Sequence, residues 1–154
     1  MLRFLWISFI VILIDQLTKI GIITYFQEFE VLKIWPVFNL TLVFNSGAAF
    51  SFLADAGGWQ IYFFSSVAII VSIILFFWLI KLENTEVKLA IAISLLLGGA
   101  IGNLIDRLVY GKVIDFLQWH WDQYYFPSFN IADSAITLGV IFFILDIFLP
   151  NKNK

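Results

Sequence analysis

Four long apolar segments alternate with shorter, more polar stretches along the chain. The segments run roughly over residues 4–25, 59–80, 87–109 and 131–149. Each is long enough for a helix that crosses a bilayer, which takes about 20 residues. The pattern predicts an α-helical integral membrane protein with four transmembrane helices, built as one membrane-embedded domain over residues 1–154. Two long loops join the segments, over residues 26–58 and 110–130.

One stretch of the first long loop has a different period. Phe38, Leu40, Leu42 and Phe44 recur at every second position among β-branched and aromatic residues. This alternation is typical of a strand, and the glycines that follow it favour turns. We therefore expect a small β-sheet region at the membrane surface beside the four helices.

The composition agrees with burial in lipid. Apolar residues make up 62 % of the chain and charged residues 13 %, whereas a soluble domain is about half apolar and about a quarter charged. A net charge of −2 provides no basic surface for nucleic acid, and a chain without cysteine has no disulfide, cysteine nucleophile or thiolate metal site. His120 is the single histidine, so we expect no metal and no cofactor.

The charges of the connecting segments predict the orientation in the membrane. Five basic residues gather on one side, in short connections: Arg3, Lys81, Lys88, Lys152 and Lys154. The long loops on the other side mix basic with acidic residues. We expect the first side to be cytoplasmic, with both termini inside and both long loops, including the sheet region, outside. Four aromatic residues are expected to anchor the outer side at the interface: Trp119, Trp121, Tyr124 and Tyr125.

Ionisable residues inside membrane spans are costly unless they are paired or hydrated, so each is a candidate functional residue. Asp15 and Lys19 are four residues apart on the first helix and share a face, where they can form a packing pair or brace a polar site. The third helix ends with Asn103, Asp106 and Arg107 on one face, after small residues that permit close helix contact. For Arg107 alone, a simpler interpretation is helix termination and pairing with Asp106.

Two further aspartates flank the second long loop. Asp115 stands between apolar neighbours, and burial of that kind raises the pKa of a carboxyl group, although a turn aspartate is the simpler interpretation. Asp133 starts the fourth helix, where Asn130 can be the N-cap and Asp133 the acid of a capping box. The third helix ends and the fourth begins on the outer side. The polar residues of both helices and of the second loop are therefore expected at one membrane face.

Two carboxylates in a half-buried site suggest hydrolysis of a peptide bond. They cannot both ionise easily, so they share a proton. The ionised carboxylate can take a proton from water, and the protonated one can hydrogen-bond the scissile carbonyl. Sequence spacing does not place the two groups side by side. Two alternatives therefore stay open, a small proton- or ion-coupled transporter that uses the buried carboxylates and Lys19 as a relay, and an assembly subunit without chemistry.

In these residues the sequence resembles the lipoprotein signal peptidase (signal peptidase II) family over nearly the whole chain. Five motifs occur in the family's order: Asp15-Gln16-Leu17-Thr18-Lys19, Asn45-Ser46-Gly47-Ala48-Ala49-Phe50-Ser51, Gly98-Gly99-Ala100-Ile101-Gly102-Asn103-Leu104-Ile105-Asp106-Arg107, Val113-Ile114-Asp115-Phe116 and Phe129-Asn130-Ile131-Ala132-Asp133. Each motif alone is weak. Five of them in order on a chain with four spans are specific.

The resemblance implies an aspartic endopeptidase of the bacterial cytoplasmic (inner) membrane. Its substrate would be a prolipoprotein with a diacylglyceryl group on the lipobox cysteine, cut just before that cysteine near the extracytoplasmic face. Asp115 and Asp133 match the catalytic pair, and Asp15 and Lys19 would support the pocket. The residues that shape the site and position the substrate would be Asn45, Gly47, Asn103, Asp106, Arg107, Asn130 and Ala132. The cyclic peptide globomycin inhibits the family, and the resemblance implies membrane lipids as further partners, with no nucleic acid and no obligatory oligomer.

Overall fold

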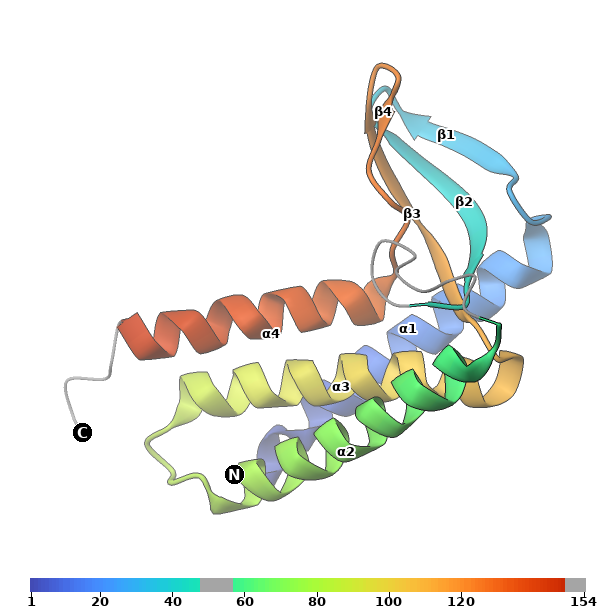
Figure 1. Ribbon diagram of the computed structural model, residues 1–154. Helices are drawn as coiled ribbons and strands as arrows, with labels where there is room; N and C mark the ends of the chain where they lie inside the picture. Colours follow the sequence, from blue (N-terminus) through green and yellow to red (C-terminus); the bar gives the residue numbers. More distant parts are fainter. Residues whose placement is uncertain (48–56, 149–154) are drawn as a thin grey trace.

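The computed structural model describes residues 1–47 and 57–148, which form four long helices and one small sheet (Figure 1). The helices are α1 (Leu5–Tyr25), preceded by the 3-10 turn η1 (Leu2–Phe4), α2 (Trp59–Lys81), α3 (Val87–Tyr110) and α4 (Ile131–Phe148). All four are long and apolar enough to cross a membrane. This confirms the four predicted spans, whose ends agree closely with the helix ends, although position 149 lies outside the described residues.

Helix α3 is the centre of the bundle. It packs against α1, α2 and α4, and it has as many buried residues as the other three helices together. Helices α2 and α4 flank α3 and barely touch each other (Figure 1). The outward faces of α1, α2 and α4 expose large apolar side chains, among them Phe9, Ile70 and Ile141. A surface of that kind is compatible with lipid and not with water.

The predicted strand in the first long loop is confirmed as part of a four-stranded antiparallel sheet. Its strands are β1 (Val31–Trp35), β2 (Phe38–Asn45), β3 (Val113–Trp121) and β4 (Tyr124–Tyr125), in the order β1-β2-β3-β4. The sheet projects from the end of the bundle where α1 ends and α4 begins (Figure 1). Strand β3 belongs to the second long loop, so the two long loops pair with each other. Four buried apolar side chains fix the sheet to the bundle: Ile22, Leu42, Ile114 and Phe116.

Glycines of α3 allow the close helix contacts that the sequence predicts. A Cβ on Gly98 would lie 2.9 Å from Val11 Cβ on α1, and one on Gly99 would meet Ala132 O and come within 2.6 Å of Ile136 Cγ1 on α4. A side chain at either position would therefore push neighbouring helices apart.

Gly99→Ala is expected to destabilise the protein by about 1–3 kcal/mol, because the added methyl overlaps the backbone of α4. Thermal unfolding in detergent, followed by tryptophan fluorescence, measures the effect. The matched control is Gly21→Ala on α1, where an added Cβ meets nothing within 4 Å and alanine favours the helix by about 1 kcal/mol. The unfolding midpoint of Gly99→Ala should lie below that of Gly21→Ala. Equal unfolding midpoints for the two variants would contradict the close packing of α3 against α4.

Candidate active site

Asp115 and Asp133 reach one cleft from two different elements. Asp115 lies near the start of β3 and is 3 % exposed, whereas Asp133 lies in the first turn of α4 and is partly exposed. Both line a cleft of about 820 Å³. Its other lining residues come mainly from α2, α3, α4 and the segment before α4. The structure therefore brings together two carboxylates that the sequence separates by a loop.

Asn130 connects the two aspartates. Its side-chain Nδ2 donates to Asp115 Oδ1 at 2.8 Å, and its backbone N–H donates to Asp133 Oδ2 at 3.3 Å. In return, the Asp133 backbone N–H donates to Asn130 Oδ1 at 2.9 Å. The last two contacts form the reciprocal capping box predicted from the sequence. The same residue therefore starts α4 and contacts both carboxyl groups.

Two more amides complete the surroundings of the carboxyl groups. Asn45 Nδ2, at the end of β2, donates to Asp115 Oδ2 at 3.0 Å. Asn103 Nδ2, on α3, donates to Asp133 Oδ1 at 2.7 Å. Each of the four carboxyl oxygens thus accepts one N–H. Neutral amide donors fix the orientation of both groups without adding a charge to the site.

The surroundings of Asp115 favour its protonated form. Burial and, after it, the nearby negative charge of Asp133 raise the pKa of the Asp115 carboxyl to about 7. Hydrogen bonds from Asn45 and Asn130 and the positive charge of Lys19 oppose this shift. A carboxyl group with a pKa near 7 can hold and release a proton at neutral pH.

Arg107 lies at the mouth of the cleft. Its Nη2 donates to Gly47 O at 3.0 Å, and its guanidinium carbon lies 5.5 Å from the ring centroid of Phe64 on α2. The simpler interpretation of Arg107 is confirmed for its place, because Arg107 lies in the last turn of α3 and its Nη1 donates to Asn103 O at 3.5 Å. The predicted pair with Asp106 is wrong. Asp106 forms its ion pair with Lys19 at 2.7 Å instead, so Arg107 is directed toward the cleft and the first long loop.

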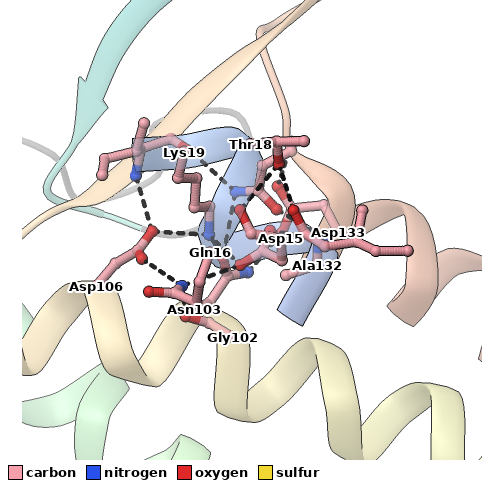
Figure 2. Close-up of polar contacts among 12 residues, drawn as sticks. Asp15, Gln16, Thr18, Lys19, Gly102, Asn103, Asp106, Ala132 and Asp133 are labelled. Carbon is pink, nitrogen blue, oxygen red and sulfur yellow. Dashed lines mark hydrogen bonds and ion pairs between the residues drawn. The ribbon is translucent and has the colours of Figure 1, made fainter. Parts of the chain in front are cut away.

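A buried ion cluster of Lys19, Asp15 and Asp106 lies close to Asp133 (Figure 2). Lys19 pairs with Asp15 at 2.8 Å, which confirms the predicted contact between these residues on one helix face. The same lysine pairs with Asp106, and Asp15 Oδ1 accepts a hydrogen bond from Ala132 N at 2.8 Å. The two ionisable residues of α1 are therefore linked to both α3 and α4.

Sequence reasoning missed two residues of the site. Gln16 was quoted within a motif and given no role, although its Nε2 lies 2.9 Å from Asp106 Oδ1 and 3.1 Å from Gly102 O. Phe64 has no polar signal and sits on a helix that is apolar all round, so only the packing identifies it. The motif residues at 48–51 lie outside the described residues.

The fold is that of bacterial membrane enzymes. Two solved structures described as a bacterial membrane enzyme match this chain with TM-scores of 0.87 and 0.83 and sequence identities of 37 % and 36 %. The matches cover 99 % and 97 % of this chain, and 91 % and 94 % of the other chains. Because the matches cover nearly the whole chain, they include the residues of the sheet as well as those of the helices.

Sequence comparisons give the family. The family model for signal peptidase (SPase) II matches residues 7–149. Lipoprotein signal peptidases of Pseudomonas putida and Acinetobacter baumannii are each 48 % identical to this chain over 99 % of its length, and over 91 % and 87 % of theirs. The chain belongs to the signal peptidase II family. As a member it is a protease that removes signal peptides from prolipoproteins, and it is a multi-pass protein of the bacterial inner membrane.

Proposed function

We propose that this protein is an aspartic endopeptidase that cuts diacylglyceryl-modified prolipoproteins just before the lipidated cysteine, with Asp115 and Asp133 as its catalytic pair. The observation that carries the proposal is the arrangement of the two carboxyl groups. They line one cleft, they share Asn130 as a partner, and each of their oxygens accepts one N–H. Such a pair can hold one proton between two carboxyl groups.

The chemistry follows from the two environments. Asp115, with its pKa near 7, supplies the protonated carboxyl, which hydrogen-bonds the oxygen of the scissile carbonyl. Asp133 sits in the first turn of α4, where the helix dipole favours negative charge, and it takes a proton from the attacking water. Asp115 passes its proton to the carbonyl oxygen in the same step, so the intermediate is a diol. The C–N bond then breaks as the proton on Asp133 passes to the nitrogen of the cysteine and one diol hydroxyl returns a proton to Asp115. The two carboxyl groups end with one proton between them, as they began.

The lining of the cleft suits a substrate that stays in the membrane. The α2 wall carries Phe64, Val67 and Val71, and the α4 wall carries Ile136 and Leu138. Because α2 and α4 both rest on α3 and barely touch each other, a signal helix and acyl chains can enter between them from the lipid. Asn45 and Arg107 also line the cleft, and Gly47 O accepts a hydrogen bond from Arg107. These three residues then orient the substrate backbone.

The orientation in the membrane follows from the basic residues. Lys81 ends α2, Lys88 begins α3 and Arg3 precedes α1, all at the end of the bundle opposite the sheet. Basic residues favour the cytoplasmic side. By this rule the aspartates and the sheet would lie on the extracytoplasmic side, where water is available for hydrolysis.

The test is cleavage of a purified prolipoprotein in detergent, with and without its diacylglyceryl group, by the purified wild-type protein. Mass spectrometry of both products should place the cut just before the cysteine, only in the lipidated substrate. Globomycin should inhibit by competition, since a cyclic peptide would occupy the same cleft. Equal cleavage of both substrates would contradict the lipid requirement. Proton or ion movement in vesicles without any cleavage would favour the transporter alternative.

Cleavage is expected to fall as the pH rises through about 7, the pKa of Asp115. Above that pH Asp115 loses the proton with which it hydrogen-bonds the scissile carbonyl. The profile of kcat/KM reports the groups of the free enzyme, so this parameter should show an alkaline limb with its midpoint near the pKa. A flat profile well above neutral pH would contradict the assignment of Asp115 as the acid.

A further inference from the structure

Lys19 uses every donor of its ammonium group in the buried ion cluster (Figure 2). The residue is 1 % exposed. Its Nζ lies 2.8 Å from Asp15 Oδ2, 2.7 Å from Asp106 Oδ2 and 3.1 Å from Asn103 Oδ1. An ammonium group has three N–H donors, so each acceptor takes one. A buried ammonium group has to satisfy all three of its donors, and each acceptor that Lys19 uses is linked in turn to Asp115 or Asp133.

The first contact leads to Asp133. Asp15 Oδ2 forms the ion pair with Lys19 Nζ. Asp15 Oδ1 accepts a hydrogen bond from the backbone N–H of Ala132 at 2.8 Å. Ala132 is the residue immediately before Asp133, and its N–H is one of the first amides of α4, which have no acceptor within the helix. The Asp15 carboxylate therefore links the start of α4 to α1, and the ion pair with Lys19 fixes the position of that carboxylate.

The second contact leads to Asp115 in the same manner. Asp106 Oδ2 forms an ion pair with Lys19 Nζ and also accepts a hydrogen bond from the backbone N–H of Ile114 at 3.1 Å. Ile114 is the residue immediately before Asp115. Both aspartates thus follow a residue whose N–H is bound by a buried carboxylate, and Lys19 bridges the two carboxylates.

The third contact reaches both carboxyl groups through amides. Asn103 Oδ1 accepts from Lys19 and from Asn130 Nδ2 at 3.1 Å, and the same Nδ2 lies 2.8 Å from Asp115 Oδ1. With its oxygen directed at two donors, Asn103 has to present Nδ2 to Asp133 Oδ1, at 2.7 Å. Lys19 therefore determines which end of the Asn103 amide faces Asp133.

We infer that Lys19 is a positioning residue for the proposed proteolysis, because its three contacts together set the separation and orientation of Asp115 and Asp133. The inference rests on the proposed function and assigns Lys19 a task beyond support of the fold. Gln16 has a secondary part in the same task. Its Nε2 lies within 3.2 Å of Asp15 Oδ2 and 2.9 Å of Asp106 Oδ1, so it joins the same two carboxylates.

The first test is Lys19→Met, which keeps the apolar stem and removes the donors and the charge. On the folded variant, kcat should fall about 100-fold, the effect of misplacing catalytic groups by a fraction of an ångström to an ångström. KM should stay near the wild-type value, because Lys19 does not line the cleft. The alkaline limb of the kcat/KM profile should move upward, because the charge of Lys19 lowers the pKa of Asp115.

The matched control is Ser8→Ala, on the same helix and against the same neighbouring helix. Ser8 is buried and its Oγ donates to Ser94 O on α3 at 2.7 Å, away from the aspartates. Its loss should lower the unfolding midpoint and leave kcat and the pH profile of the folded enzyme unchanged. Lys19→Gln, which is uncharged and has only two N–H donors for the three acceptors, is the variant to use if Lys19→Met fails to fold. Gln16→Met tests the secondary part of Gln16 with the ion pairs left in place. We expect it to lower kcat about tenfold, because it removes one side chain that joins the two carboxylates.

The outcomes separate the two proposals. Wild-type protein that does not cleave lipidated prolipoprotein would overturn the proposed function itself. Wild-type protein that cleaves, next to a folded Lys19→Met with wild-type kcat and an unshifted pH profile, would overturn the positioning role alone. Where Lys19→Met does not fold, a folded Lys19→Gln with wild-type kcat would have the same meaning, and an unchanged kcat in Gln16→Met would remove only the secondary part of Gln16.

Discussion

Asparagine in place of either Asp115 or Asp133 is expected to lower kcat by at least about 10³-fold, since each substitution removes one partner of the proton transfer. Asparagine keeps the shape of aspartate and can still accept a hydrogen bond, so the fold should survive. Steady-state cleavage of lipidated prolipoprotein measures the effect, and binding of uncleaved substrate to the variants should persist. Retention of cleavage by either variant would mean that a different carboxyl group does the chemistry.

The matched control is Asp122→Asn. Asp122 is exposed in the turn between β3 and β4 and has a φ of 51°, a left-handed conformation that asparagine accepts readily. The substitution changes the charge of the same face of the protein by the same amount and leaves the cleft intact. Its kcat should equal that of the wild type, which would exclude a general effect of charge on activity.

Asn130→Asp is expected to lower kcat by about 10³-fold, comparable to the loss of a donor that stabilises the transition state. Aspartate keeps the oxygen that caps α4. It replaces the Nδ2 donor with an oxygen that faces Asp115 Oδ1 and Asn103 Oδ1, and like charges at that distance repel. Kinetics together with circular dichroism of the variant would separate lost chemistry from lost helix.

Asn39→Asp provides the control for that substitution. Asn39 is also buried, on β2, and its Nδ2 donates to Gln118 Oε1 at 3.2 Å within the sheet. The same chemical change there should destabilise the sheet without affecting kcat of the folded enzyme. A kcat loss in Asn39→Asp as large as in Asn130→Asp would show that a buried negative charge anywhere disables the protein, and it would remove the special role of Asn130.

Local features of the fold could be read from the sequence. The spans follow from their length and apolarity, β2 from its period of two, and the contact of Asp15 with Lys19 from their spacing of four. The capping box of Asn130 and Asp133 also depends on residues three apart. In each case the residues that interact are neighbours in the chain, so helical or strand geometry alone decides the contact.

The remaining contacts depend on tertiary packing. Strand β3 forms by pairing with β2, from the other long loop. Its second half alternates between apolar and polar residues from Leu117 to Trp121, but its first half is buried without a break, so alternation does not predict the whole strand. The bond between Lys19 and Asp106 and the one from Asn103 to Asp133 each join different helices. Spacing predicted that these residues gather at one membrane face, and only the fold shows which atoms meet. The catalytic roles themselves stay predictions.

The separation of α2 from α4 has a consequence for turnover. A cleft closed on all sides would have to extract an apolar helix from the bilayer, at a cost that grows with every buried CH₂ group. A cleft with a side opening lets the signal helix and the acyl chains stay in hydrocarbon before, during and after the cut. On the proposed function, the enzyme would find its substrate by diffusion in two dimensions, and the number of lipidated precursors per membrane area, not their concentration in solution, would set the turnover rate.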